Sequence, residues 1–178
     1  MPEAASILFG GGFPRLASRE GQEAAQRAIY HVQLELEALA EGELVLCDRG
    51  TLDGLAYWPG ASEEFLRQLG TTRQRELGRY DVVIHLRVPS PKNGFNHQNR
   101  LRIESADQAR AIDRRIVAAW RGHRRRYFVD SSSDFAEKVR RALAILEREL
   151  ARSPHEQALT PPGAPLASPV CTTSPTSG

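Results

Sequence analysis

The stretch ELVLCDRGTLDGLAYW, residues 43–58, decides the predicted fold and the predicted site. Its apolar run at residues 44–47 is typical of a strand that is buried on both faces of a parallel sheet. Asp48, Arg49 and Gly50 follow at the carboxyl end of this expected strand, where α/β sheets place their ligand crevice. An aspartate there can hold Mg²⁺, and an arginine can fork onto phosphate oxygens. The same residues also fit a plain polar turn with an Asp–Arg ion pair.

The rest of the chain alternates between helix and strand patterns around this stretch. Apolar residues at steps of three and four, together with capping residues such as Ser18, Thr71 and Asp134, mark the helices. Short apolar runs that end in polar residues mark the strands. Helices are expected over residues 18–40, 62–69, 71–78 and 105–121 and from 134 onward, and further strands over 82–86 and 127–129. This alternation predicts an α/β fold in which helices cover both faces of a parallel sheet.

Length and composition are those of one ordinary globular domain. The 178 residues carry a net charge of +2, which gives no reason to expect a nucleic-acid partner. Cys47 and Cys171 make neither a disulfide framework nor a metal-binding spacing, which fits a reducing cytoplasm. No apolar run is long enough to span a bilayer. Residues 153–178 are rich in Pro, Ser and Thr and are expected to be a disordered tail, so the folded domain is placed at residues 1–152.

Six segments of the chain together resemble the AAA-type ATP-binding domain of the P-loop superfamily. This domain is shared by nicotinamide-riboside-kinase regulators and TRPL-translocation-defect proteins, and it is related to thymidylate and deoxynucleoside kinases. The resemblance covers residues 2 to about 150, and LCDRGTLDGLAYW is its most specific string. The six segments are PEAASILFGGGFPR, QRAIYHVQLELE, LVLCDRGTLDGLAYW, YDVVIHL, NHQNRLRIES and AIDRRIVAAW.

The resemblance implies a three-layer, P-loop NTPase-like α/β fold that binds ATP or GTP together with Mg²⁺. By this resemblance Asp48 is similar to the Walker-B-type acid, and Arg49 is similar to the arginine of an Asp-Arg or Glu-Arg motif. Glu3 is similar to the acid that can act as general base toward an acceptor hydroxyl in the related kinases. Asp48, Arg49 and Glu3 are therefore the expected catalytic residues, and Asp48 is the expected metal ligand.

Two further segments are expected to bind the nucleotide by the same resemblance. Arg100 and Arg102 lie where a lid would close over the phosphates. Ser131 and Ser132 begin a turn that lies where the related kinases hold the nucleotide base. Without the resemblance, the long connection over residues 88–103 also fits a solvated surface loop.

One part of the family pattern does not occur in these 178 residues. Ahead of the matching segments the family has a first strand, a Gly-x-x-x-x-Gly-Lys-Ser/Thr loop, the helix behind that loop, and a second strand. The loop supplies backbone donors for the β-phosphate, a lysine charge and a hydroxyl ligand for Mg²⁺. The sequence is therefore expected to be N-terminally truncated, either because its true start lies upstream of Met1 or because the truncation is real.

Three functions are compatible with these residues. The first is ATPase activity or a nucleoside- or nucleotide-kinase-like phosphoryl transfer to a small-molecule acceptor, which we expect to be impaired because the Gly-rich loop is missing. The second is a nucleotide-binding regulatory module that transfers no phosphoryl group. The third is a fragment without function. The sequence identifies neither the acceptor nor a preference between ATP and GTP.

Overall fold

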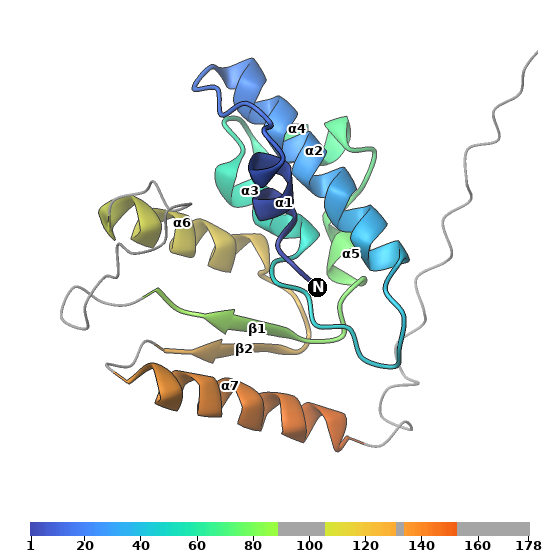
Figure 1. Cartoon of the computed structure of the whole chain (residues 1–178), viewed down its shortest axis with the longest axis vertical. Helices are drawn as coiled ribbons and strands as arrows, with labels where there is room; N and C mark the ends of the chain where they lie inside the picture. Colours follow the sequence, from blue (N-terminus) through green and yellow to red (C-terminus); the bar gives the residue numbers. More distant parts are fainter. Residues whose placement is uncertain (89–105, 131–133, 153–178) are drawn as a thin grey trace, which may run out of the picture.

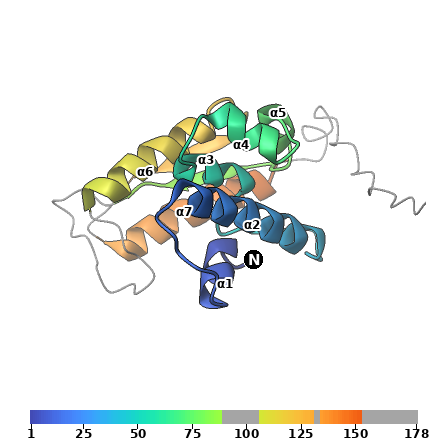
Figure 2. The ribbon, with the colours of Figure 1, turned by 90° about the horizontal axis from the view of Figure 1, so that it is seen from above.

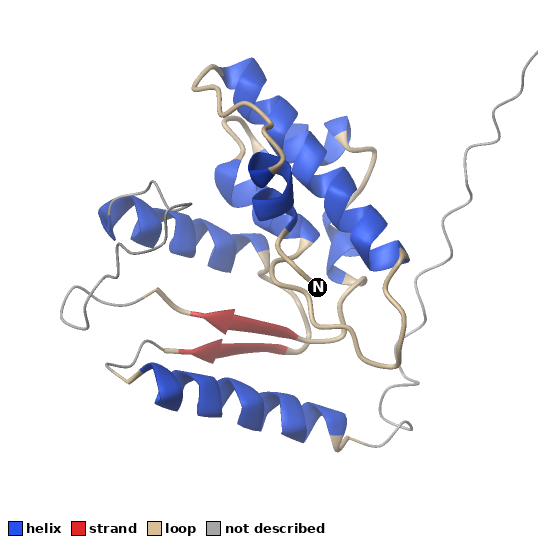
Figure 3. Cartoon of the chain, in the orientation of Figure 1, coloured by secondary structure: helices blue, strands red, loops and turns tan. Residues whose placement is uncertain are grey.

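The computed structural model describes residues 1–88, 106–130 and 134–152 (Figures 1 and 3). It is an α/β chain in which several helices surround a small parallel sheet. The expected tail at 153–178 lies outside the described residues. In chain order the elements are α1 (Ala4–Gly10), α2 (Arg19–Ala38), the 3-10 helix η1 (Thr51–Asp53), α3 (Gly54–Tyr57), α4 (Ser62–Gln68), α5 (Arg73–Leu77), β1 (Val83–Leu86), α6 (Ala106–Ala119), β2 (Arg126–Val129) and α7 (Phe135–Leu150).

The two strands form a parallel pair between helices α6 and α7. The paired residues are Val83 with Arg126, Ile84 with Tyr127, His85 with Phe128 and Leu86 with Val129. Paired residues share a face and successive residues alternate, so His85 and Tyr127 point to opposite faces of the pair. His85 contacts Asp113 of α6, and Tyr127 contacts Glu149 of α7. The two helices therefore pack against opposite faces of the strand pair (Figure 1).

The remaining helices pack together beside α6. Seen from above, α2 lies between α1 and the group of α3, α4 and α5 (Figure 2). One core cluster joins η1 and α3 to α6, and its buried members are Leu52, Ala56, Ile116, Ala119 and Trp120. A second cluster joins α2 to α4, and its buried members are Tyr30, Trp58 and Phe65. Within the described residues, no helix combines the length and the apolar character that crossing a membrane requires.

Residues 44–47, which the sequence predicts to be a buried strand, are not a strand in the structure. Leu44, Val45 and Leu46 are between 39% and 55% exposed. Met1 runs alongside them: its amino group donates to Leu46 O at 2.7 Å, and its carbonyl accepts from Asp48 N at 3.2 Å. A continuous apolar run becomes a strand only where a neighbouring strand supplies backbone partners. Pairing with Met1 alone provides too few backbone hydrogen bonds to form a sheet.

Local capping signals place the helix starts well. The side chains of Ser18 and Asp134 cap α2 and α7, as predicted. Helix α5 is capped by Thr72 instead of the expected Thr71. The Thr71 hydroxyl instead donates to the buried carboxylate of Glu76 at 2.5 Å. A buried carboxylate needs hydrogen-bond donors, so this contact replaces the capping role that the sequence pattern predicts for Thr71.

Candidate functional site

Asp48, Arg49 and Gly50 lie between the extended residues 44–47 and η1, and we call these three residues the Arg49 turn. Arg49 has a φ of +84° and is the one non-glycine residue with positive φ in the described part of the chain. For a residue that carries a side chain, this left-handed backbone costs about 1 to 2 kcal/mol. Such strain persists only where the surroundings hold it, and strained residues cluster at functional sites.

The turn brings Arg49 next to Glu3, although the two residues are far apart in the sequence. Arg49 Nε lies 3.5 Å from Glu3 Oε1, and both side chains are partly exposed. The other oxygen of Glu3 accepts a hydrogen bond from Ser6 Oγ at 2.5 Å. Asp48, the residue before Arg49, is exposed. The structure therefore places an arginine, a carboxylate and a second, exposed carboxylate at one end of the extended segment.

Asp53 is a second acid that holds Arg49, and sequence reasoning missed it. Its Oδ2 lies 3.4 Å from Arg49 Nη1, and its Oδ1 accepts a hydrogen bond from Trp120 Nε1 at 2.6 Å. The Asp53 side chain is 13% exposed, and burial raises the pKa of its carboxyl even though Arg49 and Trp120 act to lower it. The available signal was its position four residues after Arg49, a spacing at which charged side chains meet on a helix.

Several acidic groups set the electrostatics of Arg49. Burial acts to lower the pKa of its guanidinium, but the nearby Asp53, Tyr57, Glu3 and Asp48 outweigh burial and raise it. The guanidinium therefore stays charged. It presents five N–H donors in a planar fork, more than its two ion pairs occupy. Chemically, the Arg49 turn can neutralise the charge of an anionic group while a carboxylate stands beside it.

The donor set fits Mg²⁺ bound through one carboxylate. Within the described ranges, no three His, Cys, Asp or Glu side chains gather as a metal site. In phosphate-binding sites, however, Mg²⁺ takes one or two carboxylates and completes its shell with water and phosphate oxygens. The exposed carboxylate of Asp48 can be such a ligand. The charged side chain of Arg49 lies next to Asp48 in the chain.

The other expected nucleotide-binding residues lie outside the described residues. These are Arg100, Arg102, Ser131 and Ser132. The elements that flank them have the types that the sequence predicts: β1 and α6 on either side of the arginines, and β2 and α7 on either side of the serines. A lid over the phosphates and a turn at the base therefore stay predictions.

A second polar cluster lies at the carboxyl end of β1. The buried Asp113 of α6 contacts His85 Nε2 at 3.0 Å, Arg87 Nε at 3.1 Å and the backbone N–H of Val88 at 3.3 Å. Trp120, which donates to Asp53, directly follows the same helix α6. The cluster's own groups satisfy one another, so its evident role is to fix α6 to the end of β1.

Comparison with known proteins identifies the family of the chain. Residues 2–138 match a family model described as AAA domain. No curated protein and no solved structure matched the chain. The matched region contains Glu3 and the whole Arg49 turn, and it runs from α1 into α7. Because it spans well over half of the 178 residues, the chain belongs to the AAA domain family of P-loop, nucleotide-binding proteins.

Proposed function

We propose that the protein takes part in phosphoryl transfer from ATP or GTP, bound with Mg²⁺, to the hydroxyl group of a small molecule. One geometric observation carries the proposal: Glu3 and Arg49 meet at 3.5 Å beside Asp48. Membership in the AAA domain family supports a nucleotide as the ligand. Within that family, the string LCDRGTLDGLAYW favours the nicotinamide-riboside-kinase-regulator and TRPL-translocation-defect type.

Each residue has a distinct role in this proposal. Asp48 supplies one carboxylate to Mg²⁺, which when bound neutralises charge on the β- and γ-phosphates. Arg49 binds phosphate oxygens with the N–H groups that its ion pairs leave free. Glu3 accepts the proton of the acceptor hydroxyl. Meanwhile the hydroxyl oxygen forms its bond to the γ-phosphorus, and the bond from that phosphorus to the leaving diphosphate breaks.

The same proposal expects the 178-residue chain to be impaired on its own. These residues contain no Gly-x-x-x-x-Gly-Lys-Ser/Thr loop, so the phosphates would lack most of the contacts that such loops provide. We expect this chain to show no measurable ATP binding. We expect binding from a loop-bearing chain, made by joining the strand, Gly-rich loop, helix and second strand of a family member to Met1.

The test measures ATP affinity, with tryptophan fluorescence as the readout of binding. The protein has two tryptophans, so Trp58→Phe leaves Trp120, which donates to Asp53, as the single reporter. In the loop-bearing chain, Asp48→Ala is expected to weaken binding by roughly 10- to 100-fold, the range for loss of a contact between charged groups. Asp81→Ala, at an exposed acid before β1, is the matched control and should bind as the parent does. Micromolar binding that Asp48→Ala leaves unchanged would contradict the site.

A nucleotide-binding regulatory module without phosphoryl transfer is the second candidate, and one observation favours it. One oxygen of Glu3 accepts from Ser6 and the other lies by Arg49, so proton transfer to Glu3 must weaken one of these contacts. ADP release that depends on an added nucleoside would identify a kinase. ATP binding without turnover in the loop-bearing chain would identify the module, and failure of that chain to bind ATP would favour a fragment without function.

A further inference from the structure

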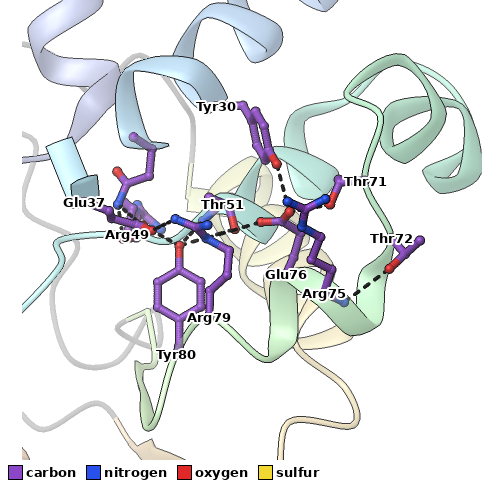
Figure 4. A network of polar contacts seen from close by, with 11 residues as sticks. Tyr30, Glu37, Arg49, Thr51, Thr71, Thr72, Arg75, Glu76, Arg79 and Tyr80 are labelled. Carbon is purple, nitrogen blue, oxygen red and sulfur yellow. Dashed lines mark hydrogen bonds and ion pairs between the residues drawn. The ribbon is translucent and has the colours of Figure 1, made fainter. Parts of the chain in front are cut away.

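The hydroxyl group of Tyr80 lies next to Thr51, the residue that follows the Arg49 turn (Figure 4). It accepts a hydrogen bond from the backbone N–H of Thr51 at 2.8 Å and donates to Glu37 Oε1 at 2.6 Å. Thr51 is the first residue of η1, and Glu37 lies in the last turn of α2. One hydroxyl thus connects α2 and the segment before β1 to the residue that follows the turn.

The carboxylate of Glu37 is fixed well enough to orient this hydroxyl. It accepts a hydrogen bond from Gln33 Nε2 at 2.9 Å and forms a close ion pair with Arg79. Burial and the neighbouring Glu37 raise the pKa of Tyr80, so its hydroxyl stays protonated. With its proton directed to Glu37, the Tyr80 oxygen presents its lone pairs to the Thr51 N–H.

The backbone around Arg49 is confined from several sides. Gln33 Nε2 donates to the carbonyl of Arg49 at 3.3 Å. A side-chain carbon on Gly50 would lie 2.6 Å from Trp120 Cζ2, closer than real contacts allow, and 3.1 Å from Tyr80 Cζ, which is tighter than most real contacts. The Tyr80 and Trp120 rings pack edge to face, with centroids 5.0 Å apart. The turn therefore rests on two aromatic rings and is held by side-chain hydrogen bonds on both sides of Gly50.

We propose that Tyr80, oriented by Glu37, is a positioning residue for the Arg49 turn. By holding the Thr51 N–H, its hydroxyl keeps Arg49 in the left-handed conformation that directs the guanidinium between Glu3 and Asp53. The inference that this position of the Arg49 guanidinium serves nucleotide binding rests on the proposed function. The hydrogen bond itself can be tested without any nucleotide.

The experiment compares two tyrosine variants of the full chain by amide hydrogen exchange. Tyr80→Phe keeps the ring on Trp120 but removes the acceptor for the Thr51 N–H. Tyr127→Phe is the matched control, because its hydroxyl also donates to a glutamate, Glu149, at 2.6 Å. The exchange rate of the Thr51 amide is measured relative to the exchange rates of the α2 amides. This relative rate is expected to be at least 10-fold higher in Tyr80→Phe than in the parent, and unchanged in Tyr127→Phe. Both variants lose one tyrosine–glutamate hydrogen bond, so a general loss of stability would accelerate Thr51 exchange in both.

A folded Tyr80→Phe variant in which Thr51 exchanges at the parent rate would overturn the proposal, and so would equal acceleration in both variants. If Tyr80→Phe does not fold, Glu37→Gln replaces it. This change keeps the volume of Glu37 and removes the charge that orients Tyr80, and it should accelerate Thr51 exchange in the same direction. Parent-rate exchange in that variant overturns the proposal as well. Failure of the loop-bearing chain to bind ATP would overturn the proposed function and leave the exchange result standing.

Discussion

Two acids, the partly buried Asp53 beside the Arg49 turn and the buried Glu149 in α7, have similar partners but opposite pKa shifts. Each pairs with arginine and accepts a hydrogen bond at 2.6 Å from an aromatic residue, Trp120 for Asp53 and Tyr127 for Glu149. Burial raises the pKa of Asp53, and its partners do not offset this effect. At Glu149 burial acts in the same direction, but the hydrogen bonds to its carboxylate outweigh burial and lower the pKa.

The difference comes from the number and closeness of the donors. Glu149 accepts from Arg125 Nε at 2.7 Å and from Arg152 Nη1 at 3.1 Å, which fixes the end of α7 to the start of β2. Asp53 has one arginine contact, Arg49, at 3.4 Å. The β2–α7 region is therefore a satisfied structural ion cluster. Beside the Arg49 turn, Asp53 keeps a raised pKa, and perturbed pKa values are common at functional sites.

The largest expected effect comes from filling the space behind the turn. Gly50→Ala would press a methyl group onto Trp120 Cζ2 at 2.6 Å, and neither that ring nor Tyr80 can move freely. We expect the free energy of unfolding to fall by about 2 to 3 kcal/mol in urea titrations. Gly10→Ala is the control, because no atom beyond its own helix backbone and chain neighbours lies within 4 Å of the added carbon, and it should cost nothing. Equal urea midpoints for the two variants would show that the turn is not confined.

The next largest effect is expected at Glu149, the acid with the closer and more numerous donors. Glu149→Gln removes the charge on which Arg125 and Arg152 depend, so we expect a loss of about 2 kcal/mol at pH 7. Glu147→Gln, an exposed position on the same helix, should cost little. The folded pKa of Glu149 is lowered, so its contribution is complete above the ordinary value of 4.5 and is lost as pH falls below it. A gap between parent and variant that persists in strong acid would contradict this account.

A smaller effect separates the backbone of Arg49 from its side chain. Arg49→Ala and Arg49→Gly both remove the guanidinium, but only glycine adopts a φ of +84° without strain. We expect the glycine variant to be the more stable of the two by about 1 kcal/mol in thermal or urea unfolding. Equal stability would mean that the turn relaxes to an ordinary conformation once the side chain is gone.

The smallest effect on stability at pH 7 is expected at Asp53. Asp53→Asn keeps an acceptor for Trp120 and removes a carboxylate whose burial outweighs its long ion pair to Arg49, so the stability at pH 7 should stay within about 1 kcal/mol of the parent. The folded pKa of Asp53 is raised, so the parent is most favoured over the variant below the ordinary value of 3.8. It loses that advantage as pH rises through the folded pKa. NMR titrations of the Asp53 and Glu149 carboxyl groups measure both pKa values directly. If the two pKa values are shifted in the same direction, the contrast between the two acids is wrong.

Local signals in the sequence were enough to place most elements of the fold. Ser18 and Asp134 mark helix starts because a short polar side chain satisfies a free backbone N–H at a helix end. Residues 44–47 were mispredicted, because an apolar run can form a strand only with partners that other parts of the chain supply. Its own composition does not reveal whether those partners are present.

The candidate site was predictable to a similar extent. The family resemblance pointed to Glu3 and Arg49, and the structure brings these two side chains together. Tyr80 and Trp120 come from other elements, and their partners are set by packing across the core, for which the sequence has no local pattern. The contact of Asp53 with Arg49 had a spacing signal, but its hydrogen bond to Trp120 did not.

The most direct test of the central claim is the Mg²⁺ dependence of ATP affinity in the loop-bearing chain, compared between the parent and Asp48→Asn. If Asp48 faces the phosphates beside Arg49 and Glu3, removing Mg²⁺ should weaken ATP binding at least 10-fold in the parent and have little effect in the variant. A variant that keeps the full Mg²⁺ dependence of the parent would contradict the assignment of the Arg49 turn as the phosphate end of a nucleotide site.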